Sequence, residues 1–358
     1  MLFSHQSLYD FTYKIFIKNA FAEEVAHRAA TNLVKADLRG IDSHGMARLS
    51  GYIRLAKAGR IKPAAQLEII HQTPSTATLD ADGGLGLWTA HEAMKIAIDK
   101  AKNVGSGWVA VQNSSHFGIA AAHAEMALEH DMIGFAMTNA SPLVAPAGAK
   151  QAFLGTNPIC VAIPAGKNMP FIMDLATAAA ANGKLEIAQR KEKPIPQGWA
   201  QTAEGEATTD ANALKSGGTL LPLGSDADHG YHKGYGLGAW VDIFTGVLSG
   251  ANFGAWVPPF VAFLDQQKNL PGKGIGHFVG CWRIDAFQPA GEFKKRMDVW
   301  INGVKNLEKA KGIDEILIPG EPEFRIEKER LVTGIPLQQK VVEDLEKLAI
   351  ENDISFVI

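Results

Sequence analysis

Apolar residues near both ends of the chain recur every three or four positions, which is the spacing of amphipathic helices. This spacing runs through residues 8–16 and 25–36, and it appears again over residues 336–350. Gly40 and Gly59 lie within the first sixty residues, and we expect each to end a helix because glycine is favoured at that position. The pattern therefore predicts helical segments at both ends of the chain.

The central part of the chain mixes short apolar runs with further helical patterns. The apolar runs predict strands at residues 67–70, 76–79, 108–111, 133–137, 159–163, 171–173 and 276–284. The helical patterns cover residues 87–104, 119–130, 182–191, 234–248 and 292–309. Pro74-Ser75 separates the first two runs and predicts a hairpin. Residues 194–224, rich in Gly, Pro, Thr and Asp, are expected to form a long ordered loop that carries function.

The order of these elements predicts an α+β fold, because strict alternation of strands and helices is absent. We expect a sheet-containing domain over residues 76–309. A helical domain is expected over residues 1–75, joined by C-terminal helices over residues 310–358. The chain has 358 residues, which is enough for two or three such lobes.

Composition excludes several classes of protein. The chain is 46% hydrophobic and 20% charged, which is typical of a soluble globular protein, and no apolar run is long enough for a membrane span. The formal net charge of −3 provides no basic surface for nucleic acid. Cys160 and Cys281 both lie in apolar runs and are interpreted as buried free thiols, so we expect a cytoplasmic protein.

Two histidines and an arginine are the strongest candidates for chemistry. His44 and Arg48 are four residues apart, so a helix would place them on one face. A guanidinium that binds a carboxylate beside a group that moves a proton suits a 2-hydroxy or 2-oxo acid. Tyr52, one turn further on, either donates to a substrate carboxylate or packs, and His116 follows a strand-like run. For both histidines a structural role at a turn remains the alternative.

Other motifs indicate phosphate binding less specifically. Lys233 lies just ahead of an apolar helix, where backbone N–H groups would also face a phosphate. Asp174 ends a predicted strand, and residues 319–321 form a turn; by composition alone, a capping and a turn role suffice for them. No segment matches the G-x-G-x-x-G fingerprint of common dinucleotide folds. No paired-cysteine or H-E-x-x-H pattern is present either, so no metal site is predicted.

The order and spacing of six motifs, taken together, are specific. They are Asp42-Ser43-His44-Gly45, Asn113 to Gly118, Gly155 to Pro158, Met173 to Thr177, His232 to Gly236 and Pro319-Gly320-Glu321. With these motifs the chain resembles the type 2 malate/L-lactate dehydrogenases over nearly its whole length. That family also includes ureidoglycolate dehydrogenase, diketogulonate reductase, sulfolactate dehydrogenase and piperideine-2-carboxylate reductase.

The resemblance implies an oxidoreductase that uses NAD or NADP, binds the nucleotide on a non-Rossmann sheet domain and forms a homodimer. It implies that His44 or His116 is the acid/base group and that Arg48 holds the substrate carboxylate. Ser43 and Arg48 are expected to be catalytic as well, and Tyr52 and Thr156 are expected to bind the substrate with Arg48. The implied cofactor-binding residues are Asn139, Ser141, Asp174, Leu175, Ala176, His232, Lys233, Gly234, Pro319, Gly320 and Glu321. The apolar N-terminal helices and residues 255–261 are expected to contribute to a dimer interface.

We therefore predict hydride transfer between a nicotinamide and C2 of a small 2-hydroxy or 2-oxo acid, similar to malate or lactate. One alternative is a reductase of cyclic ketimine carboxylates, in which the proton goes to nitrogen. The other is a catalytically silent nucleotide-binding protein. The presence of His44, Arg48, His116 and Lys233 argues against silence.

Overall fold

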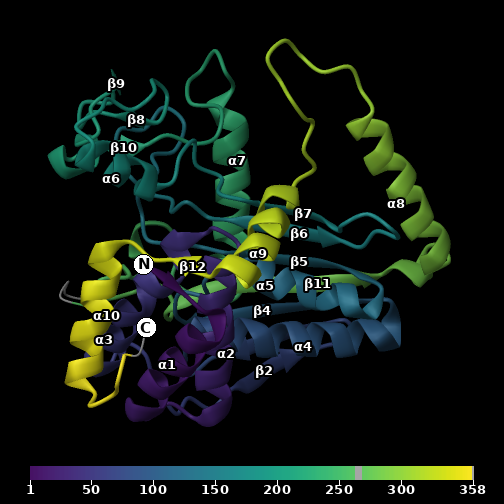
Figure 1. Ribbon diagram of the computed structural model, residues 1–358, viewed down its shortest axis with the longest axis horizontal. Helices are drawn as coiled ribbons and strands as arrows, with labels where there is room; N and C mark the ends of the chain where they lie inside the picture. The colour runs from purple at the N-terminus through teal and green to yellow at the C-terminus, as the bar shows by residue number, and fades with distance from the viewer. Residues whose placement is uncertain (263–267, 357–358) are drawn as a thin grey trace.

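A seven-stranded mixed sheet organises the computed structural model, which describes residues 1–262 and 268–356 (Figure 1). The strands lie in the order β2-β3-β4-β11-β5-β6-β7. Their bounds are β2 Glu68–Gln72, β3 Thr76–Asp80, β4 Ser106–Ser114, β5 Met132–Thr138, β6 Ile159–Ile163, β7 Phe171–Leu175 and β11 Ile275–Arg283. The pair β3 and β4 is parallel, and the other neighbours are antiparallel. A late strand thus occupies the centre of the sheet.

Helices from both ends of the chain pack into one apolar cluster. They are α1 His5–Lys18, α2 Glu23–Leu38, α3 Leu49–Lys57 and α10 Gln339–Glu351. Strands β1 Leu2–Phe3 and β12 Ile335–Pro336 pair antiparallel and join the two ends, and Figure 1 shows both termini on this side of the molecule. Leu8, Leu33 and Leu345 are fully buried in the cluster. The helical spacing of apolar residues therefore predicted α1, α2 and α10 correctly.

The two faces of the main sheet are covered differently. Helix α4 Gly86–Val104 lies on one face. Its buried side is a row of alanines, and it packs so closely on β4 that a side chain on Gly107 would overlap the α4 backbone. Helix α7 Tyr231–Asp242 continues into the π-helical turn η5 Ile243–Val247. On the other face Trp108, Phe135 and Trp240 contribute to an aromatic cluster.

Four further α-helices are present in the described part of the chain. They are α5 Ala121–Ala124, α6 Asn182–Arg190, α8 Ala290–Lys305 and α9 Glu321–Thr333. Short 3-10 turns are η1 Asp42–His44, η2 Met46–Arg48, η3 Glu125–His130, η4 Ala213–Ser216, η6 Gly254–Trp256 and η7 Ile284–Ala286. No helix in the described part of the chain is long and apolar enough to cross a membrane.

Two predictions of local structure were wrong. The segment expected to be a long loop holds a small sheet, ordered β10-β8-β9, of strands β8 Ala200–Gln201, β9 Ala207–Thr208 and β10 Thr219–Leu220. Two-residue strands are too short to show an alternating pattern. The expected helix over residues 119–130 is α5 followed by η3. The turn expected at residues 319–321 is confirmed, since the Glu321 N–H donates to the Ile318 carbonyl oxygen just as α9 begins. The mixed α and β content agrees with the predicted fold in its coarse form, whereas the domain boundaries remain predictions.

Candidate active site

A carboxylate from α2 shapes the turn that carries His44. The Asp37 Oδ2 atom accepts a hydrogen bond from the Met46 N–H at 2.7 Å, and any side chain on Gly45 would overlap this carboxylate. Burial raises the pKa of Asp37 to about 7. Gly45 separates η1 from η2, so a single helix does not carry His44 and Arg48. Close packing against Asp37, rather than helical spacing, sets the direction of this segment.

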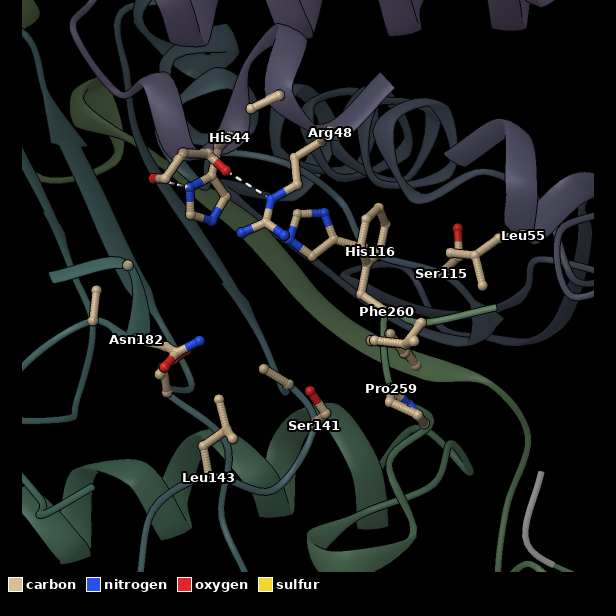
Figure 2. Close-up of a pocket in the computed structure, with 18 of the residues that line it drawn as sticks. His44, Arg48, Leu55, Ser115, His116, Ser141, Leu143, Asn182, Pro259 and Phe260 are labelled. Carbon is tan, nitrogen blue, oxygen red and sulfur yellow. Dashed lines mark hydrogen bonds between the residues drawn. The ribbon is translucent and has the colours of Figure 1, made fainter. Parts of the chain in front are cut away.

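Arg48 is held by the same turn. Its Nε donates to the Ser43 carbonyl oxygen at 2.7 Å, while the Ser43 hydroxyl lies 2.9 Å from the His44 Nδ1. Figure 2 shows the guanidinium alongside both imidazole rings, extending toward the open space. No described residue accepts a hydrogen bond from its two terminal nitrogens. These nitrogens are therefore available to bind a carboxylate with two parallel hydrogen bonds.

His116 reaches the same place from the end of β4. Its ring lies 5.5 Å, between centroids, from the ring of His44. The Tyr52 hydroxyl lies 2.6 Å from the His116 Nδ1, and the Gly118 backbone nitrogen lies 3.3 Å from the same atom. Asn113 and Gly118 adopt positive φ angles and turn the backbone here. Two segments 72 residues apart thus meet in one site.

The environment keeps both imidazoles neutral at neutral pH. Burial and, to a smaller extent, the nearby Arg48 charge together lower the pKa of His44 to about 4. The pKa of His116 is lowered well below its usual value by burial and by His44 and Arg48. Burial raises the pKa of Tyr52, so its phenol stays protonated. Both rings line a cavity, which explains why part of their surface remains accessible although protein surrounds them.

Buried polar residues that the sequence patterns did not reveal support the His116 turn. His277 on β11 lies 2.8 Å from the Ser114 hydroxyl through Nε2 and 2.8 Å from the Thr138 hydroxyl through Nδ1. The Phe117 ring stacks on His277 and also contacts His123, which is fully buried. His277 comes from a strand 161 residues away in the sequence, so no local signal could have indicated this contact.

The histidines lie on the wall of a cavity of about 1830 Å³. Ser141, Thr156 and Asn182 line it as well, and Figure 2 shows Ser141 and Asn182 across the open space from His44. Pockets for one drug-sized ligand measure roughly 300–1,000 Å³. The cavity is therefore large enough for a dinucleotide together with a small substrate. The hydroxyls of Ser141 and Thr156 and the positive N-terminal end of α6 at Asn182 can bind polar groups of these ligands.

The other predicted cofactor residues lie outside the cavity lining within the described ranges. The Asn139 side chain is buried and bonds to the Asn252 carbonyl and the Gly276 N–H at 2.7 and 3.1 Å. The Asp174 carboxylate at the end of β7, next to Leu175 and Ala176, accepts from the Ala121 N–H at 2.8 Å. Both polar side chains are already engaged with the protein.

Two further groups of predicted residues flank β7 and α7. The Pro319 carbonyl accepts from the Ile172 N–H at 3.0 Å, so this turn runs alongside β7. Gly320 has a positive φ, and Glu321 pairs with Lys305 at 2.7 Å. His232 and Lys233 are exposed in the first turn of α7. Gly234 is buried there, and it packs so closely on the Leu223 backbone that a side chain would overlap it.

The geometry defines a site for a small carboxylate beside a proton carrier, in a cavity large enough for a dinucleotide. The family model for malate/L-lactate dehydrogenase matches residues 3–346. The malate dehydrogenase of Pyrococcus abyssi is 43% identical over 96% of this chain and 92% of its own. The L-sulfolactate dehydrogenase of Methanocaldococcus jannaschii is 39% identical over 92% of this chain and 91% of its own. The solved structure of malate dehydrogenase from Pyrococcus horikoshii OT3 is 37% identical, has a TM-score of 0.90, and matches 99% of this chain and 96% of that one.

The chain belongs to the malate/L-lactate dehydrogenase family. It is an oxidoreductase that acts on the CH–OH group of 2-hydroxy acids, and the family implies a nicotinamide cofactor. The resemblance seen in the six motifs is confirmed.

Proposed function

We propose that the enzyme oxidises malate or a closely related 2-hydroxy acid to the 2-oxo acid, with the substrate carboxylate on Arg48. The observation that carries this proposal is the guanidinium, whose two terminal nitrogens contact no acceptor in the described residues, beside two neutral imidazoles. The relatives named malate dehydrogenase support malate as the first substrate to test. Thr156, on the cavity wall, is assigned to the remainder of the substrate.

His116 is assigned as the proton carrier. A general base needs a second group that orients it, and His116 has the buried Tyr52 hydroxyl at its Nδ1, whereas His44 contacts the exposed Ser43. A hydroxyl both donates and accepts, so Tyr52 can accept from Nδ1–H while Nε2 takes the proton of the substrate hydroxyl. In the reverse direction the protonated ring returns the Nε2 proton to the substrate oxygen, and Tyr52 still accepts from Nδ1–H. His44 then positions the substrate oxygen, and Tyr52 orients His116 rather than binding the carboxylate.

A nicotinamide cofactor supplies or accepts the hydride when bound. Ser141 and the first turn of α6 at Asn182 are assigned to its polar groups, since both face the cavity. The ends of β7 and α7, with Asp174–Ala176, Lys233 and residues 319–321, are assigned to the more distant part of the nucleotide. Either NAD or NADP is expected, and the assay below distinguishes them.

The test is a substrate panel followed by nicotinamide absorbance with NAD and with NADP. The panel contains malate, lactate, sulfolactate and the matching 2-oxo acids, with pyrroline- and piperideine-2-carboxylate as ketimines. The proposal predicts the highest kcat/KM for malate or another 2-hydroxy acid and strong competition by oxamate. Preferential turnover of the ketimines would contradict it and favour the alternative reductase.

A homodimer is also proposed, supported by a surface different from the predicted one. Val257 is buried and Phe260 packs against Tyr52, and the apolar sides of the N-terminal helices fill the core, so neither is a free surface. Exposed apolar side chains instead follow α7 and η5, namely Tyr235, Leu237, Ile243, Val247 and Leu248. Sedimentation equilibrium at micromolar concentration should give twice the 38.4 kDa of one chain, and a single-chain mass would refute the dimer.

A cytoplasmic location is proposed as well. Cys160 and Cys281 are both buried free thiols, as is common for proteins of a reducing compartment. Localisation of a tagged full-length chain tests this, and recovery outside the cytoplasm would contradict it.

A further inference from the structure

The Phe260 ring contacts three working side chains of the site. Its centroid lies 4.9 Å from that of Tyr52, edge to face, and 5.0 Å from that of His116. The Arg48 guanidinium carbon lies 5.6 Å from the same centroid. Figure 2 shows Phe260 beside His116 on the cavity wall. One ring therefore touches the carboxylate-binding group, the proton carrier and the residue that orients the carrier.

Arg60 holds the backbone on both sides of this ring. Its two terminal nitrogens donate to the Pro259 and Val261 carbonyl oxygens, each at 2.6 Å. Pro258 and Pro259 restrict the backbone further, because proline fixes its own φ and limits the preceding residue. Phe260 thus stands on a segment with few alternative conformations.

Helix α3 contains a notch for the ring. Arg48, Gly51, Tyr52 and Leu55 are spaced so that they share one face, and Leu55 also lines the cavity. A Cβ on Gly51 would lie 2.5 Å from the Phe260 Cε1, which is closer than nonbonded carbons approach. The glycine therefore leaves the space that Phe260 occupies between Arg48 and Tyr52.

We propose that Phe260 is a positioning residue of the reaction, which holds the Arg48 guanidinium in place to bind the substrate carboxylate. Guanidinium groups are attracted to aromatic faces, and the attraction grows where water is excluded. The ring also packs against His116, so the carboxylate and the hydroxyl proton are aligned by the same contact. The inference rests on the proposed role of Arg48 and adds a residue that does not itself touch the reacting atoms.

The first test compares Phe260→Leu with Phe260→Tyr and with Phe253→Leu as a matched control. Phe253 lies in the same segment and packs on Trp256 rather than on the histidines. We expect Phe260→Leu to raise KM for the best 2-hydroxy acid about tenfold, the scale of a desolvated cation–π contact. The dissociation constant of the nicotinamide nucleotide should stay unchanged. Phe260→Tyr should restore KM to within about twofold, because the aromatic face is kept.

The second test displaces the ring without changing it. Gly51→Ala should raise KM in the native background but have little further effect with Phe260→Leu, since contacting residues show non-additive effects. Arg60→Met removes the two hydrogen bonds to the Phe260 segment but keeps the Phe260 ring, and it should also raise KM. This variant tests the inference independently if Phe260→Leu does not fold. Circular dichroism and thermal melting monitor the fold of each variant.

Two outcomes would overturn the inference. One is a Phe260→Leu variant with the KM of Phe253→Leu, and the other is additive effects of Gly51→Ala and Phe260→Leu. Arg48→Lys distinguishes a failure of this inference from a failure of the proposed function. If Arg48→Lys raises KM while the Phe260 and Arg60 variants do not, only this inference fails. If Arg48→Lys also leaves KM unchanged, the proposed function fails with it.

Discussion

The proposed substrate side of the cavity and the ends of β7 and α7 contrast within the same chain. On the substrate side, His44, Arg48 and His116 already lie together, and Tyr52 and Phe260 hold them. At the ends of β7 and α7 the predicted nucleotide residues are dispersed, and Asp174 and Glu321 are paired with other parts of the protein. Proton transfer and carboxylate binding need accurate alignment, whereas a nucleotide has many separate groups to bind. We therefore expect large effects of single substitutions on the first side and small ones on the second.

The largest effect is expected for His116→Ala. Loss of the proton carrier should lower kcat by about a hundredfold or more, the usual scale of general acid–base catalysis, and leave nucleotide affinity unchanged. Steady-state kinetics measure kcat, and nucleotide titration measures the affinity. His44→Ala is the matched comparison, and we expect it to lower kcat less. A larger loss in His44→Ala would exchange the two roles, and native turnover in both variants would refute the site.

Arg48→Lys should raise KM for 2-hydroxy acids by at least tenfold. An ammonium cannot make two parallel hydrogen bonds to a carboxylate as a guanidinium does, and a hydrogen bond to a charged group contributes about 1.5–3 kcal/mol. The inhibition constant of oxamate should rise in parallel. Unchanged values for both would place the carboxylate elsewhere in the cavity.

Tyr52→Phe should lower kcat by about fivefold, because it removes one neutral hydrogen bond of roughly 1 kcal/mol from the His116 Nδ1. The His116 ring keeps its packing on Phe260, so the effect stays below that of His116→Ala. The ring of residue 52 and its packing on Phe260 remain, which keeps KM near the native value. A rise in KM with unchanged kcat would instead assign Tyr52 to the carboxylate.

Lys233→Ala should weaken nucleotide binding only about threefold, consistent with an exposed charge near a helix N-terminus. Lys233 is exposed in the first turn of α7, so the fold should not change. Fluorescence titration at low and high salt measures the affinity, and the difference from the native enzyme should shrink at high salt. A loss above a hundredfold would show that this region is as strictly organised as the substrate side.

The smallest effect is expected for pH. A histidine with an ordinary pKa near 6.5 would be half protonated at pH 6.5, and a base in that state would lose about half its activity. Burial, His44 and Arg48 lower the pKa of His116, so it stays neutral until the pH falls well below 6.5. The kcat/KM for oxidation should therefore change little between pH 7.5 and 6.5 and decline at lower pH. An acid limb at or above pH 6.5 would contradict the assignment.

The sequence by itself determined the class of the enzyme, most helices and the main strands. Apolar spacing identified α1, α2, α4 and α10 because each buries one continuous face, and the motifs around His44 and His116 identified the family because chemistry restricts those residues. The apolar spacing did not predict the small sheet, because its two-residue strands are too short to show a periodic pattern.

The tertiary structure alone decided which residues support the chemistry. Gly45 and Gly51 looked like ordinary glycines in the sequence, yet one makes room for Asp37 and the other for Phe260. Phe260 was assigned to a dimer surface, because an apolar run looks alike whether it covers a cavity or a partner. His277 reaches the His116 turn from a distant strand. Contacts between residues far apart in the chain leave no local pattern, so only the folded structure reveals them.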